Sequence, residues 1–499
     1  MSTTPTQAPV AAVIVLAAGG GTRMKSKNSK LLHPVAGRAM LSYALDAAQT
    51  LNPAKLVVVV GHLREQVEAL LDESYPQVTI VEQPVRNGTG GAVQCAIGAL
   101  GEINREVVVT YGDVPMLTGE TLGELVAAHR AGGNACTVLT AVVPDPTGYG
   151  RIVREGGQVA KIVEHRDANE AERQIREINS GIYVFDGKVL REGLASLKPN
   201  NDQAELYLTD VLGYARGHQG NVGAYLTDDI WQTEGVNDRV QLARMNAEVN
   251  RRIVERWMLD GVTVVDPKTT WIEADVDLET DVTILPNTQL LGATSVATGA
   301  VIGPDTTLRD VEVGENAHVI RTHGELSVIN SDAEVGPFAR LRPGTVLGAH
   351  GKIGTFVETK NAQIGDGSKL PHLTYCGDAF IGEGVNVGAG TIFANYDGSH
   401  KSPTHLGNDV FIGSNSVLVA PLDIGDGAFV AAGSAVVDDV PPGALAVARG
   451  REHISADWVH RKRAGSSASD AANDSEGEIH PAVAEARAKL REENQEDDQ

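Results

Sequence analysis

The chain has 499 residues, which is too long for one hydrophobic core, so we expect two or three domains. Its net charge of −23 and its pI near 5.0 argue against a nucleic acid or an anionic membrane as a partner. Three cysteines are too few for a disulfide framework, no secretory signal is visible and no apolar run could cross a bilayer, so we expect a cytoplasmic protein.

The first part of the chain, up to about residue 235, alternates strand-like and helix-like segments. Short apolar runs lie at residues 13–18, 56–60, 78–81 and 107–110, and helical patterning lies at residues 40–51, 65–71, 92–100 and 120–130. This alternation predicts an α/β domain over residues 11–235, with a mainly parallel sheet covered by helices on both faces. Residues 1–10 before it are expected to be flexible.

A glycine-rich string, LAAGGGTRM, runs from Leu16 to Met24 directly after the first strand, and Lys30 lies six residues beyond it. Such a loop exposes backbone N–H groups at the sheet edge where phosphates bind, and Arg23 and Lys30 add positive charge. The string is neither a dinucleotide-binding G-x-G-x-x-G nor a P-loop. It closely resembles the signature of the sugar-1-phosphate nucleotidylyltransferases.

Asp113 comes after the strand at residues 107–110, in the sequence Tyr111-Gly112-Asp113. A carboxylate at a strand's end beside a triphosphate site predicts a Mg²⁺ ligand, and the alternative is a strand-terminating turn residue. The glycine string upstream favours the metal. In the family that the string resembles, the second ligand is an Asn near the end of the domain, which here would be Asn237.

Residues 236–259 contain neither Pro nor Gly and predict one long helix. Apolar residues recur at helical spacing, with charges between them, at Val240, Met245, Val249, Ile253 and Trp257. We expect this segment, residues 236–262, to link the α/β domain to the C-terminal half of the chain.

From Ile272 onward an aliphatic residue occupies every sixth position. The residues are Ile272, Leu278, Ile284, Leu290, Val296, Ile302 and Leu308, and later Leu406, Ile412, Leu418, Ile424, Val430 and Val436. A helix repeats at 3.6 residues and a half-buried strand at 2, whereas six residues make one short strand plus one corner. The period predicts a β-solenoid with an aliphatic core. Glycine often comes next after the aliphatic residue, where we expect a corner with positive φ.

This period resembles the hexapeptide pattern of the left-handed β-helix acyltransferases. The resemblance implies the left-handed sense, and many of those enzymes are trimers that bind acetyl-CoA between neighbouring solenoids. The phase breaks around residues 321–331 and again between Phe393 and Leu406, and we expect residues 394–405 to loop out of the coil. The acidic tail, residues 456–499, is expected to be disordered, with at most a short helix at residues 482–493.

In their order along the chain, the two halves resemble the bifunctional N-acetylglucosamine-1-phosphate uridylyltransferase / glucosamine-1-phosphate N-acetyltransferase family over roughly residues 11–455. The resemblance implies a Rossmann-like nucleotidyltransferase domain and a left-handed parallel β-helix over residues 263–455 that forms a homotrimer. The expected activity makes UDP-N-acetylglucosamine, a cell-wall precursor, from small-molecule substrates, with acetyl-CoA and UTP as co-substrates and Mg²⁺ for uridylyl transfer.

The resemblance also implies which residues form the uridylyltransferase site. Uracil would be held by Gln83, Gly88 and Thr89, and the sugar by Gly150, Glu164 and Asn179. The remaining nucleotide contacts would be Leu16, Ala17, Gly19, Arg23, Lys30, Tyr111, Gly112 and Asn237, with Asp113 and Asn237 on Mg²⁺. Gly20 departs from the family, in which some members carry Lys or another residue there, so phosphate contacts at this position fall to the backbone.

In the solenoid, His372 matches the family's general base, although a lone His is more often structural. The amino-sugar phosphate would be bound by Arg342, Lys360, Tyr375 and Asn386. Acetyl-CoA would be bound by Ala389, Asn395, Tyr396, Ser414, Ala432 and Arg449, with Asn395 and Tyr396 also able to contact the sugar.

Other functions fit parts of the sequence. A nucleotidylyltransferase with a regulatory solenoid, as in ADP-glucose synthesis, would not need His372 or Asn395-Tyr396. A non-catalytic subunit would not need Asp113, Lys30 and His372. A serine or maltose acetyltransferase would not need the N-terminal domain.

Overall fold

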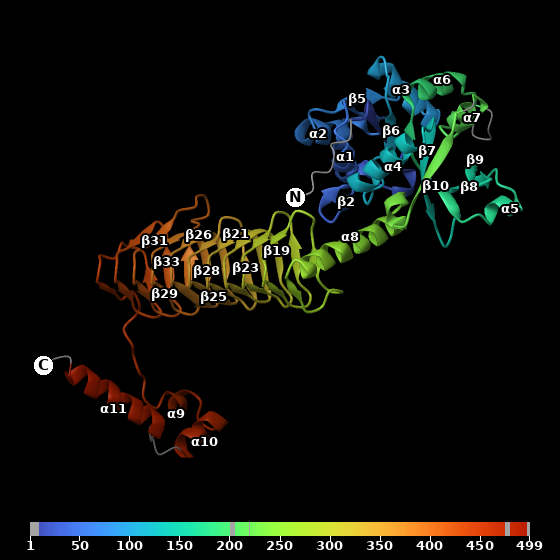
Figure 1. Cartoon of the computed structure of the whole chain (residues 1–499). Coiled ribbons are helices and arrows are strands. Elements are labelled where there is room, and N and C mark those ends of the chain that lie inside the picture. Colours follow the sequence, from blue (N-terminus) through green and yellow to red (C-terminus); the bar gives the residue numbers. More distant parts are fainter. Residues whose placement is uncertain (1–8, 200–204, 219, 475–479, 497–499) are drawn as a thin grey trace. The chain divides into compact units, whose positions relative to one another are not determined.

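The computed structural model describes residues 9–199, 205–218, 220–474 and 480–496, so most of the expected N-terminal extension lies outside the described residues. The chain divides into two compact units, Met1–Ala446 and Val447–Gln499. The larger unit contains, in chain order, an α/β domain, a long helix and a β-solenoid (Figure 1). None of the helices in the described ranges combines the length and apolar character that crossing a membrane requires.

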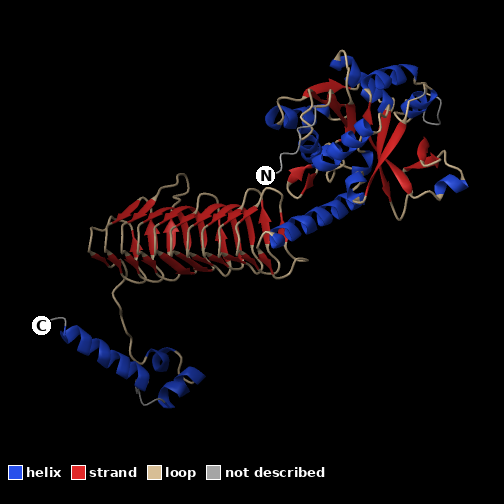
Figure 2. Ribbon diagram, viewed as in Figure 1, coloured by secondary structure: helices blue, strands red, loops and turns tan. Residues whose placement is uncertain are grey.

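The α/β domain is built on a sheet with the strand order β11-β7-β10-β6-β1-β4-β5. Its parallel centre consists of β1 (Ala12–Ala17), β4 (Lys55–Val60), β5 (Thr79–Glu82) and β6 (Val107–Tyr111). Side chains of β1 alternate between two cores, so that Ile14 packs with α3 (Thr89–Leu100), and Val15 packs with α1 (Met40–Gln49), α2 (Arg64–Ser74) and α4 (Gly119–Ala131). Figure 2 shows the helices on both faces of this sheet. The predicted strands, helices and two-sided cover are confirmed.

Within the main path of the sheet, one strand is antiparallel to its neighbours. β10 (Glu177–Phe185) lies between β6 and β7 (Cys136–Val142) and is antiparallel to both. It also pairs with the hairpin of β8 (Gly150–Glu155) and β9 (Gln158–Val163), while β11 (Val222–Thr227) closes the edge beyond β7. Between β10 and β11 the chain forms the helices α6 (Gly187–Ser196) and α7 (Asp210–Gly217). The reversal sets Gly150 opposite Asn179, which sequence patterning did not predict.

The predicted linking helix is α8 (Arg239–Leu259). It begins three residues later than expected because Asp238 caps it, accepting hydrogen bonds from the backbone N–H groups of Val240 and Gln241. Its buried side chains join the core of the first solenoid coils. Asn250 fastens the helix to that coil, since its side chain donates to Thr270 O (2.9 Å) and accepts from Ile272 N (2.9 Å).

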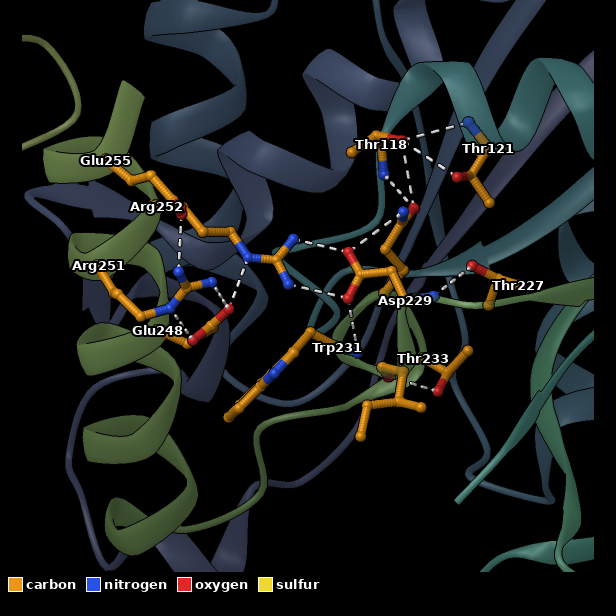
Figure 3. Close-up of polar contacts among 12 residues, drawn as sticks. Thr118, Thr121, Thr227, Asp229, Trp231, Thr233, Glu248, Arg251, Arg252 and Glu255 are labelled. Atoms are coloured by element: carbon orange, nitrogen blue, oxygen red, sulfur yellow. Dashed lines mark hydrogen bonds and ion pairs between the residues drawn. The ribbon is translucent and has the colours of Figure 1, made fainter. Parts of the chain in front are cut away.

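A network of charges fastens α8 to the α/β domain (Figure 3). The guanidinium of Arg252 donates to both carboxylate oxygens of Asp229, at 2.6 and 2.9 Å, and its Nε donates to Glu248 (2.7 Å). Asp229 also accepts from the backbone N–H of Trp231 at the start of η3 (Ile230–Thr233). The hydrogen bond from Arg252 lowers the pKa of Asp229. The helix is therefore attached to the segment that leads into Asn237.

The solenoid is a parallel β-helix that runs from β12 (Thr263–Val264) to β37 (Leu445–Ala446). Within residues 263–446, all of which the structure describes, the strands form an 11-stranded and a 15-stranded parallel sheet. The larger sheet turns a corner, because the first half of β26 (Glu358–Ile364) pairs with β23 (Ala339–Leu341) and the second half pairs with β24 (Val346–Leu347). Every aliphatic residue of the six-residue period is buried. The predicted solenoid is confirmed, and its left-handed sense stays a prediction.

The two breaks in the period have different structural causes. Ile284 pairs with Ile302, 18 residues later, whereas Val319 pairs with Val335, only 16 residues later. The first break is therefore a shortened coil. At the second break Val387 pairs with Ile412, 25 residues later. The extra residues lie between β30 (Ile392–Ala394) and β31 (Thr404–Leu406), as predicted, and an antiparallel bridge joins Tyr396 to Lys401.

The glycines that follow the core residues have two structural explanations, of which the sequence suggested only one. Gly303 has a positive φ of 103°, as expected for a corner, but Gly354 and Gly413 do not. A Cβ at Gly354 would lie 2.0 Å from Pro371 O, and one at Gly413 would lie 2.3 Å from Ala432 N. At these positions glycine is required because the backbone of the next coil approaches closely.

The second unit contains the helices α9 (Trp458–Lys462), α10 (Ser467–Asp474) and α11 (Pro481–Glu496). The sequence predicted disorder here, with one short helix at residues 482–493, which lies within α11. Ala, Glu, Lys and Arg are strong helix formers, and Glu485 and Lys489 pair one turn apart (3.1 Å), which accounts for α11. Nearly all described side chains of this unit are exposed, and Ser469 is buried.

Candidate active sites

Two adjoining cavities open at the carboxyl ends of β1 and β6, where ligands bind in open parallel sheets. Their volumes are about 350 and 480 Å³, and both are lined by Thr89, Tyr111 and Glu205. The smaller one is also lined by Leu16, Ala17, Gly19, Gly20, Lys30, Gln83, Arg86, Gly88 and Asp113, and the larger one by Gly150, Glu164 and Asn179. The structure therefore brings most of the predicted uridylyltransferase residues into one cleft.

The glycine string wraps closely around Lys30. Gly21 has a φ of 57°, and a Cβ there would lie 2.9 Å from Cβ of Lys30, so only glycine fits without strain. Gly19 faces open space in the cavity. Arg23 lies in η1 (Thr22–Met24) with an exposed side chain and lines neither cavity. Gly112 also lies outside the lining, packed against Leu41.

Asp113 and Asn237 converge on one point, although they lie far apart in the sequence. The ammonium group of Lys30 contacts Asp113 Oδ2 and donates to Asn237 Oδ1 at 3.1 Å. The backbone holds the pair together, because Val236 N donates to the carbonyl of Asp113 (2.9 Å). A carboxylate oxygen and an amide oxygen around one cation form a donor set that fits Mg²⁺ once phosphate oxygens complete it.

The segment that carries Gln83, Gly88 and Thr89 is held rigidly. The Gln83 side chain is buried and donates to Asn87 Oδ1 (3.2 Å) and to Gly88 O (3.1 Å). Gly88 has a φ of 98°, and a Cβ there would lie 2.6 Å from Leu206 O. The Thr89 hydroxyl accepts from Leu208 N (3.2 Å). One wall of the smaller cavity is therefore fixed before any ligand binds.

The larger cavity offers an amide and a carboxyl group that suit sugar hydroxyls. Asn179 Oδ1 accepts from the Tyr183 hydroxyl (2.9 Å) and from Gly181 N (3.0 Å), which fixes its amide. Burial raises the pKa of Glu164, and the charges of Asp167 and Asp210 add to that shift. Sequence patterning missed the tyrosines Tyr149, Tyr183 and Tyr207 in this lining, since they enter through the antiparallel part of the sheet and the segment after it.

On the solenoid, His372 and three of the predicted coenzyme A residues stack along one corner. His372 O accepts from Gly390 N (3.3 Å), Ala389 O accepts from Asn415 N (2.7 Å), and Ser414 O accepts from Gly433 N (2.8 Å). His372, Ala389, Ser414 and Ala432 therefore lie one after another along successive coils. The imidazole of His372 is exposed at the end of β27 (Lys369–His372), and it has no hydrogen-bond partner among the residues that the structure describes.

A cluster of positive charge lies on the adjoining face. Leu341 pairs with Thr359, so Arg342 and Lys360 are neighbours on successive coils, and Arg342 donates to Glu358 (3.0 Å). The Lys401 ammonium, in direct contact, lowers the pKa of Lys360, and Arg342 adds to that effect. Lys401 lies on the inserted loop and was missed in the sequence, where nothing placed it opposite Lys360.

The other predicted residues of this half lie in different parts of the structure. Tyr375 begins β28 (Tyr375–Ile381), and Asn395 is buried and donates to Asp378 (2.5 Å). Tyr396 is 58% exposed on the inserted loop. Asn386 lies on β29 (Asn386–Val387), in the smaller sheet and thus around the corner from Arg342. Arg449 belongs to the second unit of the chain.

Comparison with known proteins agrees with this architecture. Residues 13–177 match the MobA-like NTP transferase domain. The bifunctional protein GlmU of Paenarthrobacter aurescens is 58% identical over 459 residues, covering 91% of this chain and 92% of that protein. GlmU of Pseudarthrobacter chlorophenolicus is 57% identical (93% and 95% covered), and GlmU of Streptomyces avermitilis is 52% identical (93% and 96% covered). These similarities extend over both halves, and the chain belongs to the family of bifunctional GlmU proteins that its two sequence signatures predicted.

Proposed function

We propose that the chain catalyses two successive steps of UDP-N-acetylglucosamine synthesis. Its solenoid transfers the acetyl group of acetyl-CoA to glucosamine-1-phosphate, and its α/β domain then transfers the uridylyl group of UTP to the product. The observation that carries this function is the convergence of Lys30, Asp113 and Asn237 in a cleft beside the glycine loop. The exposed His372 on a separate corner of the same chain supports the second activity.

In the acetyl-transfer step, the 2-amino nitrogen of glucosamine-1-phosphate attacks the thioester carbon of acetyl-CoA. A C–N bond forms, the C–S bond breaks and the thiolate of coenzyme A leaves. His372 accepts the proton that the amine loses, as a neutral imidazole can when it acts as a general base. Arg342, Lys360 and Lys401 bind the sugar phosphate through charge-assisted contacts.

In the uridylyl-transfer step, a phosphate oxygen of N-acetylglucosamine-1-phosphate attacks the α-phosphorus of UTP, and pyrophosphate leaves. No protein nucleophile is needed, so the chain contributes positioning and neutralisation of charge. The loop amides and Lys30 hold the phosphates, and Gln83 and Gly88 bind uracil. Glu164 accepts hydrogen bonds from the sugar, and the side-chain N–H groups of Asn179 donate to it. Arg23, which is exposed, is free to turn toward the phosphates.

Asp113 and Asn237 would hold Mg²⁺, whose role is to neutralise charge on the phosphates. The position that a cation would take is occupied by the ammonium of Lys30. With Mg²⁺ held there, Lys30 would be available to the triphosphate. This arrangement supports a shared role for the lysine and the metal ligands in one site.

We further propose that the solenoids assemble as a trimer in the cytoplasm, where UTP and acetyl-CoA are found. The support is the split between Asn386 and Arg342, which lie on different faces of one solenoid. A neighbouring chain would add a second wall to the corner that carries His372. Multi-angle light scattering of the full chain should give three times the mass of 52.6 kDa, and an active monomer would contradict the shared site.

Mass spectrometry of a complete reaction tests the function directly. Pure protein is incubated with glucosamine-1-phosphate, acetyl-CoA, UTP and Mg²⁺, and then with one component omitted at a time. We expect UDP-N-acetylglucosamine, free coenzyme A and pyrophosphate in the complete mixture. Without UTP the reaction should stop at N-acetylglucosamine-1-phosphate. Coenzyme A release with no UDP-sugar in the complete mixture would refute the bifunctional assignment.

A further inference from the structure

The side chain of Arg86 extends over the glycine loop. A Cβ built on Gly20 would lie 2.6 Å from Nη1 of Arg86, so the guanidinium occupies the space that a side chain at position 20 would take. Both residues line the 350 Å³ cavity together with Lys30 and Asp113. Glycine at position 20 therefore leaves room for a cation that comes from another part of the chain.

The backbone that carries Arg86 is fixed. Asn87 O accepts from Leu206 N (2.7 Å), and the neighbouring Gly88 is locked against Leu206. The side chain of Arg86 is exposed, and it has no carboxylate partner within the described residues. An arginine that is held over a loop of backbone N–H groups, and is not neutralised by an acid, is suited to an anion.

We propose that Arg86 is a further phosphate-binding residue of the uridylyltransferase site, a proposal that rests on the function proposed above. It binds the β- and γ-phosphates of UTP, which leave as pyrophosphate. The proposed uracil contacts Gln83, Gly88 and Thr89 lie on the same segment as Arg86, whereas the guanidinium lies beside Gly20 of the glycine loop. Arg86 thus supplies positive charge over the loop at Gly20, a position that carries no side chain of its own.

Kinetics in both directions distinguish a phosphate contact from a contact with the base. In full-length Arg86→Ala we expect the KM for UTP, and the KM for pyrophosphate in the reverse reaction, to rise about 5- to 20-fold, as for the loss of a charge-assisted hydrogen bond at an exposed site. The KM for UDP-N-acetylglucosamine and the rate of acetyl transfer should not change. Arg105→Ala, an exposed arginine outside both cavities, is the matched control.

A charge swap sharpens the test. In the double variant Gly20→Lys/Arg86→Ala, a lysine at position 20 enters the vacated space, and the KM for pyrophosphate should return toward the wild-type value. An unchanged KM for pyrophosphate in Arg86→Ala would overturn the proposal, as would a raised KM for UDP-N-acetylglucosamine alone, which would place Arg86 on the uracil. Calorimetric binding of UTP and pyrophosphate gives the same comparison without turnover. If wild-type protein binds them but makes no UDP-sugar, the proposed function fails while the role of Arg86 is still decided.

Discussion

The two candidate sites of this chain differ in how far their charged and polar groups are enclosed and paired. The uridylyltransferase site is a cleft in which Lys30, Asp113 and Asn237 meet from distant parts of the chain and satisfy one another. The acetyltransferase site is an exposed corner, where the imidazole of His372 has no partner in the described residues and Lys360 faces another cation. A site that is complete in one chain contrasts with one that, in the assembly proposed above, is completed by a neighbouring subunit.

Removing the proposed metal ligand should have the largest effect and should affect only the cleft. We expect Asp113→Ala to lower uridylyl transfer by at least about 10³-fold, because the phosphates then lose a bound cation that is worth several kcal/mol. Acetyl transfer should be unchanged in the same preparation. Asp72→Ala, an exposed aspartate on α2, serves as the control, and parallel loss of both activities in a folded protein would contradict two separate sites.

Removing the imidazole should affect only the corner. In His372→Ala the kcat of acetyl transfer should fall by about 10²- to 10⁴-fold, the usual contribution of a positioned base, while uridylyl transfer is retained. In the wild-type protein, acetyl transfer should also fall on acidification, because less of the substrate amine is then free of its proton. His350→Ala, an exposed solenoid histidine, is the matched control. A near-normal kcat in folded His372→Ala would show that His372 is not the general base.

The cluster of positive charge predicts a pH dependence that the cleft does not share. Lys401 lowers the pKa of Lys360, so Lys360 loses its proton at a lower pH than an ordinary lysine. The KM for glucosamine-1-phosphate should therefore rise in the alkaline range below the usual lysine pKa. Lys360→Ala should raise that KM about 10-fold at neutral pH, whereas the control Lys352→Ala should not.

Lys401→Ala provides the converse test of the same cluster. Without the neighbouring ammonium, the pKa of Lys360 moves back toward its ordinary value. The KM at neutral pH should rise because one phosphate contact is lost, while its alkaline increase should move to higher pH. If the alkaline increase in KM occurs at the same pH as in the wild-type protein, Lys360 is not the titrating group.

The smallest effect is expected at the junction of the domain and the helix. Arg252→Ala should destabilise this junction by about 1 kcal/mol, since the ion pair with Asp229 is partly screened by solvent, and should lower the Tm by about 2–4 °C. Because the pKa of Asp229 is lower in the folded protein, its contribution is present above the unfolded value of about 3.9 and is lost as the pH falls through the folded value. Arg251→Ala removes contacts within α8 only and should change the Tm less.

Features that arise from local sequence patterns could be predicted, whereas contacts between distant segments could not. The six-residue period predicted the solenoid because each core residue, such as Ile302, repeats a local pattern, and the glycine string predicted the phosphate loop for the same reason. The antiparallel β10, the reach of Arg86 over Gly20 and the approach of Lys401 to Lys360 depend on contacts between distant segments. No periodic pattern encodes such contacts, so they emerged only from the folded chain.

Complementation between two variants tests the separation of the sites most directly. Asp113→Ala and His372→Ala proteins are each incubated with glucosamine-1-phosphate, acetyl-CoA, UTP and Mg²⁺, alone and mixed, and UDP-N-acetylglucosamine is measured by mass spectrometry. Each variant alone should make little or none, and the mixture should make it readily, since N-acetylglucosamine-1-phosphate released by one protein can enter the cleft of the other. A mixture that yields no more than the sum of its parts, although each variant retains its one activity, would contradict two independent sites.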